Sequence, residues 1–96
     1  MTIKKSLNGN EITLALEGWL DTKAASELLA ELEQLEDGAD SMVLDFSGLE
    51  YIASTGVRAV VTAYKKMNGA LTLCHVSDEI MSVIRMTGLD KRITIA

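Results

Sequence analysis

Residues 43–61 read VLDFSGLEYIASTGVRAVV, and this stretch decides the fold because it joins a strand to a helix. The consecutive apolar residues at 42–44 are typical of a central strand that is buried on both faces. Apolar residues at helical spacing then predict a helix over 55–67: Val57, Val60, Val61 and Tyr64. We expect residues 47–53 to form the loop between these two elements.

Upstream of this stretch, the sequence predicts a hairpin. The Asn-Gly pair at 8–9 favours a tight turn between strands over 2–7 and 11–17, and Gly18 is expected to close the second strand.

The first helix is predicted to begin after this hairpin. Asp21 or Thr22 can cap its start, and Gly38 suits its exit. Leucine and alanine recur along it at helical spacing: Ala25, Leu28, Leu29, Leu32 and Leu35.

Downstream of residue 67, the sequence predicts a strand over 70–76, a third helix and a short last strand at 92–96. Ser77 can cap the third helix and Gly88 can stop it. The order is therefore β-β-α-β-α-β-α-β. We expect one α/β domain over 1–96, in which helices pack on a mixed, mostly parallel sheet whose first strand is antiparallel.

Composition narrows the classes of function. The chain has 96 residues, a net charge of −5 and a pI of about 4.7, so nucleic acid is not an expected partner, because affinity for it depends on lysine and arginine. Proteins or small molecules are the expected partners. We find no signal peptide and no apolar run long enough to span a membrane, so we expect a cytoplasmic protein without direct membrane contact.

The cysteine count also limits the chemistry. Cys74 is the single cysteine, from which we expect no internal disulfide and no cysteine-based zinc site of any kind. His75 is the single histidine, at the end of a predicted strand, where its role is usually structural. We therefore expect no catalytic residue, no metal site and no cofactor.

Ser54 is the residue of greatest interest at the strand–helix junction. Its simplest role is to cap the helix. A hydroxyl at a helix start is also a good place for a phosphoryl group, because the first N–H groups and the positive end of the helix dipole favour an anion. Gly56, which helix propensity does not explain, is expected to leave this hydroxyl uncovered.

Residues 43–61 closely resemble the signature of the STAS domain, as found in bacterial anti-sigma factor antagonists. In that signature an aliphatic strand, an Asp or Asn, a serine and a spacer precede "SSG" or "STG" and an apolar helix. The segment LEGWLDTKAASEL at 16–28 also resembles the "G-x-L-D…A" segment that leads into the first helix of the family. The predicted order of elements is that of the family as well.

The resemblance implies a function and a set of residues. Ser54 matches the serine that an anti-sigma factor with serine kinase activity phosphorylates. The unphosphorylated form binds that kinase, the phosphorylated form does not, and a phosphatase resets the switch, which regulates transcription. The expected partner-binding residues surround this serine: Asp21, Thr55, Gly56 and Arg58.

Two further residues can be compared with the family. Asp45 matches the polar residue that ends the central strand. Many kinase-responsive members carry an aspartate directly before the phosphorylated serine, where it could orient the hydroxyl or help the Mg²⁺ of the kinase, and this chain has Ala53 there. Many members also continue into another helix after the last strand, so we expect part of the sheet to be uncovered or to be covered by a partner.

Other interpretations stay open at this point. Ser47 and Thr55 are alternative phosphate acceptors. Ser54, His75 and Asp21 could form a nucleophilic set, and Asp21 with Asp45 could form a carboxylate pair at the carboxyl edge of the sheet. The alternative function is a STAS subunit of a transport or scaffold complex, which is not phosphorylated and which its partner holds constitutively.

Overall fold

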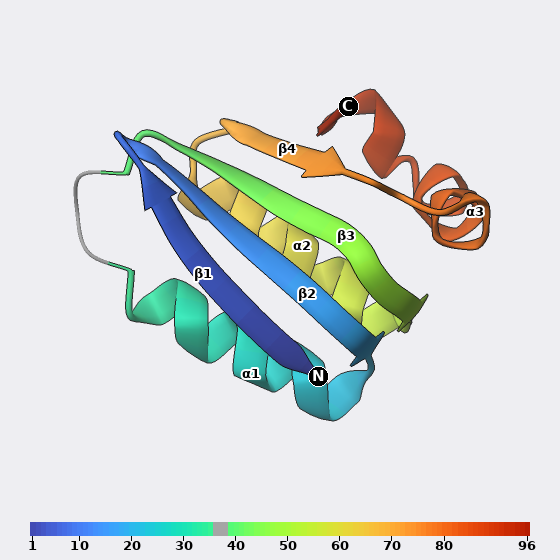
Figure 1. The fold of residues 1–96 in the computed structure, drawn as a ribbon. Coiled ribbons are helices and arrows are strands. Elements are labelled where there is room, and N and C mark those ends of the chain that lie inside the picture. The colour runs from blue at the N-terminus through green and yellow to red at the C-terminus, as the bar shows by residue number, and fades with distance from the viewer. Residues whose placement is uncertain (36–38) are drawn as a thin grey trace.

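The computed structural model describes residues 1–35 and 39–96. Its elements are β1 (Thr2–Asn8), β2 (Glu11–Leu20), α1 (Thr22–Glu33), β3 (Ser41–Ile52), α2 (Ser54–Lys66), β4 (Leu71–Cys74), α3 (Asp78–Thr87), the short 3-10 helix η1 (Leu89–Lys91) and β5 (Thr94–Ile95). Within these residues the five strands form one sheet in chain order (Figure 1). β1 is antiparallel to β2, and the other pairs are parallel, so the predicted mixed α/β fold is confirmed.

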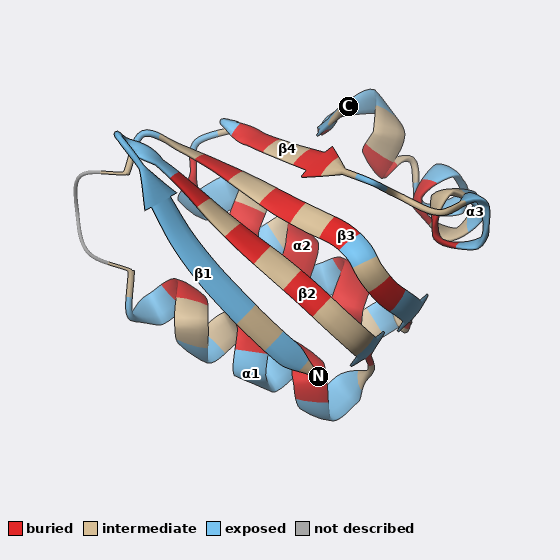
Figure 2. Cartoon of the chain, viewed as in Figure 1, coloured by how far each residue is buried: buried red, intermediate tan, exposed pale blue. Residues whose placement is uncertain are grey.

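The helices cover the sheet unevenly. α1 and α2 lie side by side behind one face, whereas α3 lies beyond the end of β4 (Figure 1). Burial alternates along the first part of β2 and β3 (Figure 2), where the buried positions are Ile12, Leu14, Leu16, Met42, Leu44 and Phe46. Leu20, Leu49 and Ile52, toward the ends of the two strands, are buried as well. Val43 is only half-buried. The expectation that the central strand is buried on both faces is therefore wrong, because successive side chains of a strand point to opposite faces and α1 and α2 cover one of them.

β2 and β3 are both longer than the sequence predicts. β2 continues past Gly18 to Leu20, and β3 continues through the predicted loop at 47–53 as far as Ile52. The pairing between the two strands shifts at two points, between Ala15 and Glu17 and between Gly18 and Trp19. These irregularities let the ladder continue past residues that normally interrupt strands.

Asp21, one of the two candidate caps of α1, caps that helix, and Ser77 caps α3 as predicted. The Asp21 carboxylate accepts a hydrogen bond from the Ala24 N–H at 2.9 Å, and the Ser77 hydroxyl accepts one from the Ile80 N–H at 3.3 Å. Gly88 ends α3 with a φ of 77°. The predicted helix exit at Gly38 lies outside the described residues. In the described part of the chain, the helices are too short or too polar for any of them to cross a membrane.

Gly56 is buried in the first turn of α2, where the helix meets the end of β2. A Cβ at this position would lie 2.7 Å from both the Cγ and the backbone oxygen of Leu20, and 3.0 Å from Cγ1 of Ile52. Glycine is therefore needed for close packing. Ser54 is exposed, as expected, but Gly56 is explained by packing, since a Cβ at 56 would point into the core.

We predict that Gly56→Ala destabilises the fold by about 1–3 kcal/mol, although alanine is the better helix former, because the backbone oxygen of Leu20 cannot move aside cheaply. Urea denaturation would measure this. Gly48→Ala is the matched control: its Cβ would come closest to the Glu17 Cγ at 2.7 Å, which belongs to a flexible, partly exposed side chain. Equal losses in the two variants would contradict the packing argument.

Candidate functional site

Two helices begin side by side at one edge of the sheet. Leu20 and Ile52 are register partners at the ends of β2 and β3, and the Ala53 N–H donates to the Leu20 carbonyl at 2.9 Å. α1 and α2 start directly after these strands, and the hydroxyls of Thr22 and Thr55 are 3.1 Å apart. The positive ends of two helix dipoles therefore lie together, which favours an anion at this edge.

Ser54 is exposed and is the first helical residue of α2. Ala53 is the N-cap, with φ −90° and ψ 167°, and it makes no side-chain cap bond. The prediction that Ser54 caps the helix is therefore wrong: the helix begins one residue earlier than the predicted start at 55. The first turn contains no acidic residue, so no carboxylate of α2 itself competes for its N–H groups.

The four residues predicted to bind a partner differ in accessibility. Asp21 is half-buried and its carboxylate caps α1; Thr55 is half-buried and bonded to Thr22; Gly56 is buried. Arg58 is exposed, one turn after Ser54. The fold brings all four to the same edge, and their role in partner binding stays a prediction.

An open groove of about 210 Å³ runs between α1 and α2 and begins at the two threonines. It is lined by small and hydroxyl side chains, one leucine and one arginine: Thr22, Ala25, Ser26, Leu29, Thr55, Arg58, Ala59 and Thr62. Its lining combines methyl groups with hydroxyls, and it starts next to Ser54. It could accept a side chain from a protein docked over the helix starts.

Trp19 and Tyr51 form an exposed aromatic pair that sequence reasoning missed. They are register partners near the ends of β2 and β3, their ring centroids are 5.3 Å apart, and their exposed fractions are 58% and 46%. Leu20 and Ile52, which follow them in the chain, are buried, so the aromatic rings point away from the core. The available signal was two large aromatics placed between buried strand residues in a chain with 4% aromatics.

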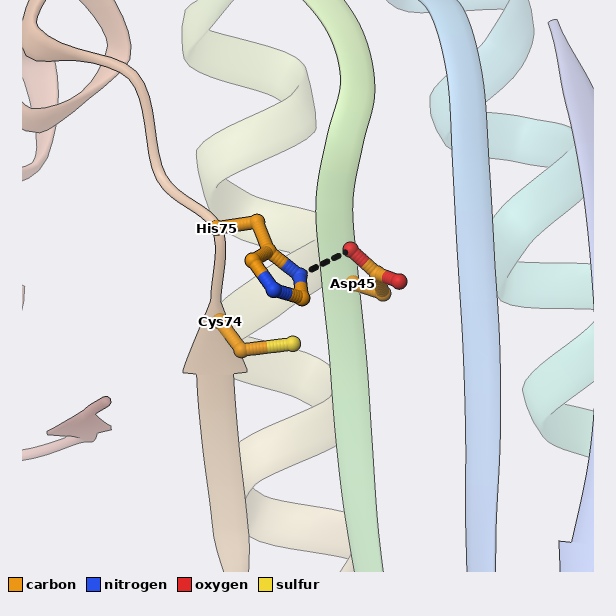
Figure 3. A group of neighbouring side chains, drawn as sticks. All are labelled: Asp45, Cys74 and His75. Atoms are coloured by element: carbon orange, nitrogen blue, oxygen red, sulfur yellow. Dashed lines mark hydrogen bonds and ion pairs between the residues drawn. The ribbon is translucent and has the colours of Figure 1, made fainter.

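A second group of polar residues lies at the first half of β3, away from the end of the strand that leads into α2. Asp45 does not end the central strand as expected: it lies inside β3, opposite Cys74 of β4. Its Oδ1 accepts the Ser47 backbone N–H at 2.9 Å and is 2.9 Å from Nδ1 of His75 (Figure 3). The Ser47 N–H, and secondarily His75, lower the pKa of Asp45 against the opposing effect of burial, whereas burial and the nearby Asp45 charge raise the pKa of the Cys74 thiol.

This placement excludes the two alternative sites considered from the sequence. Asp45 precedes Ile52 by seven residues of strand, which at about 3.3 Å per residue is roughly 20 Å. Asp21 follows the register partner of Ile52, so it is far from Asp45 and forms no carboxylate pair with it. His75 is held at Asp45 and is likewise far from Ser54, which excludes the nucleophilic set of Ser54, His75 and Asp21.

Because Ala53 has the backbone geometry of a cap without a capping side chain, we predict that Ala53→Ser stabilises the fold by about 0.5–1 kcal/mol. Ser54→Ala is the matched control and should change the free energy of unfolding by less than about 0.5 kcal/mol. Urea denaturation of both variants tests this assignment. A loss of about 1 kcal/mol in Ser54→Ala would show that the serine is the cap after all.

The chain is similar to a known domain family, to a named bacterial protein and to several solved structures. The family model described as "Mlab, STAS domain" matches residues 3–95. The BtrV protein of Bordetella bronchiseptica, which carries the name of an anti-sigma factor antagonist, is 34% identical over 77 residues. That alignment covers 76% of this chain and 66% of BtrV, so the matched region spans just under two thirds of this relative.

Solved structures show the same fold. An anti-sigma factor antagonist from Mycobacterium paratuberculosis superposes with a TM-score of 0.87 at 21% identity, over 98% of this chain and 83% of the other. The phosphorylated form of the Bacillus cell fate determinant SpoIIAA superposes with a TM-score of 0.76 at 18% identity, over 99% and 91%. Together with the family match over 3–95, these findings show that the chain belongs to the STAS domain family.

Proposed function

We propose that this chain is an anti-sigma factor antagonist whose binding to its partner is controlled by phosphorylation of Ser54. Unphosphorylated, it binds an anti-sigma factor with serine kinase activity and thereby regulates transcription; phosphorylated on Ser54, it is released, and a phosphatase restores it. It acts by binding and is not an enzyme. The name of BtrV supports the class of function, and the likeness to SpoIIAA, whose phosphorylated form is known, supports a fold that accepts a phosphate.

The observation that carries this proposal is the position of the Ser54 hydroxyl. It is exposed at the opening of α2, beside the start of α1, where a kinase can reach it. A phosphoryl group adds about −1.5 to −2 charges, and the helix N–H groups can accept it. Arg58 lies four residues later, within reach of a group on the same helix face. Phosphorylation would therefore leave the fold intact.

The phosphorylated protein is then released from its partner because the phosphate disrupts the surface of contact, and not because the protein unfolds. The partner covers Ser54 together with the Trp19–Tyr51 pair, which supplies the large aromatic area that interface centres favour. A dianion at the centre of such a contact must lose its water, and it adds bulk where two surfaces fit closely. Both effects oppose binding.

The direct test is to incubate the protein with ATP and its cognate kinase and to locate phosphate by mass spectrometry. Phosphate is expected on Ser54 and absent from Ser54→Ala. Ser47→Ala and Thr55→Val remove the alternative acceptors and should leave phosphorylation in place. A partner that stays bound with ATP present, with no phosphate on Ser54, would favour the alternative of a constitutive transport or scaffold subunit.

We predict that Ser54→Asp weakens partner binding at least about tenfold while the melting temperature stays within a few degrees, because the helix start tolerates an anion. Ser54→Asn is the matched control, because asparagine has nearly the same shape as aspartate but carries no charge. This variant should bind the partner more tightly than Ser54→Asp does. Calorimetric titration of the partner measures both. A large drop in melting temperature for Ser54→Asp would show that the hydroxyl is structural.

For the aromatic pair, we predict that Trp19→Ala or Tyr51→Ala weakens partner binding at least about tenfold, the cost typical of a central aromatic contact. Met86→Ala is the control, since Met86 is 86% exposed on α3 and belongs to a different element. The same titration applies, with circular dichroism to check folding. If all three variants bind like the wild type, the partner docks elsewhere.

A further inference from the structure

The sheet face opposite α1 and α2 carries an unusual combination of side chains. Asp45 of β3 and Cys74 of β4 are register partners whose side chains lie on this face, and His75 follows Cys74 (Figure 3). One carboxylate oxygen, the sulfur and one imidazole nitrogen all lie within 4.8 Å of one another. Carboxylate, thiolate and imidazole are the three ligand types that proteins use to bind zinc.

The backbone at His75 is what brings the third ligand to this group. Successive residues of an extended strand point to opposite faces, so Cys74 and His75 would ordinarily diverge. His75 instead has a φ of 55°, which lies in the left-handed region of backbone conformation that residues other than glycine rarely adopt. The turn returns its ring to the same face, where Nδ1 is 2.9 Å from Oδ1 of Asp45. Such local strain is found preferentially at functional sites.

The carboxylate is also fixed in advance. The Ser47 backbone N–H holds Oδ1 of Asp45 at 2.9 Å, which is the kind of outer contact that orients metal ligands. On the other side of Asp45, the register partner in β2 is Ala15, whose methyl group leaves the approach to the carboxylate open. Cys74 is half-buried and His75 is exposed, so the imidazole can adjust without disturbing the core.

We propose that Asp45, Cys74 and His75 form a site for a single zinc ion, with a fourth position open to water. Tetrahedral zinc with bonds of about 2.0–2.3 Å places its ligand atoms about 3.3–3.8 Å apart. Separations of up to 4.8 Å must therefore shorten by up to about 1 Å, and the 2.9 Å between Nδ1 of His75 and Oδ1 of Asp45 must lengthen slightly if both atoms bind the ion. A hard cation such as Mg²⁺ or Ca²⁺ does not suit it, because those ions take oxygen ligands.

The protons balance in a simple way. Asp45 enters as a carboxylate, and the neutral imidazole keeps its proton on the nitrogen that does not bind metal. The Cys74 thiol loses one proton to solvent as the sulfur–zinc bond forms, so each zinc bound releases one proton. The expectation that a single cysteine excludes any cysteine-based zinc site is too broad, because a mixed site of one thiolate, one carboxylate and one imidazole needs only Cys74.

The test titrates the untagged protein with Zn²⁺ by calorimetry, and with Co²⁺ by absorption spectroscopy. One ion per chain is expected, and the Co²⁺ form should show a thiolate-to-cobalt charge-transfer band. Cys74→Ser, Asp45→Asn and His75→Asn should each weaken binding at least about tenfold, and Cys74→Ser should abolish the band. Asparagine at 75 tolerates the left-handed backbone, which preserves the fold.

Asp40→Asn is the control, since Asp40 is an exposed carboxylate in the connection before β3, and it should bind Zn²⁺ like the wild type. In the unaltered protein, Zn²⁺ should also slow alkylation of Cys74, and a chelator should restore the rate. Equal Zn²⁺ affinity in the wild type and Cys74→Ser, or alkylation that Zn²⁺ does not slow, would overturn the proposal. These measurements need no kinase, so they are independent of the proposed switch at Ser54.

Discussion

The close contact between Gly56 and the end of β2 is the constraint on which the rest of the structure depends. Because residue 56 has no Cβ, the first turn of α2 can pack directly against the Leu20 carbonyl. The same carbonyl accepts a hydrogen bond from the Ala53 N–H. This contact fixes the rotation of the helix about its axis, because each residue turns it by about 100°. Ser54, two residues earlier, then faces solvent, and Thr55 faces Thr22. A one-residue shift would present a different side chain at the edge.

Local patterns were sufficient to predict the order of the strands and helices and several of the residues at which the helices begin or end. Ser77 and Gly88 could be assigned, and the cap of α1 could be narrowed to Asp21 or Thr22, because capping depends on a few neighbouring atoms. The start of α2 could not be predicted to the residue. Serine is a far better N-cap than alanine, so the sequence favours Ser54 as the cap. The N-cap is Ala53 instead, because the close packing of Gly56 against Leu20 fixes which residue begins the helix. Tertiary packing overrode a local preference.

The cluster on the open face could not be predicted for a different reason. A strand predicted over 70–76 places Cys74 and His75 on opposite faces, whereas β4 ends at Cys74 and the left-handed turn at His75 reverses that expectation. Their proximity to Asp45 depends on the register between β3 and β4, which no local pattern specifies. The exposed pair of Trp19 and Tyr51 was missed likewise, because β3 was expected to end before Tyr51.

The separation of the two sites along β3 limits how the proposed switch can work. Roughly 20 Å of strand lies between Asp45 and the start of α2, about twice the distance over which physiological salt screens exposed charges. A phosphate on Ser54 would therefore act little on the cluster at Asp45 through its field. A transmitted effect would need an element with two arrangements, but the junction is held by buried packing around Gly56 and by the Leu20–Ile52 pairing. The effect of the phosphate is thus expected at the surface that carries it, in the contact with the partner.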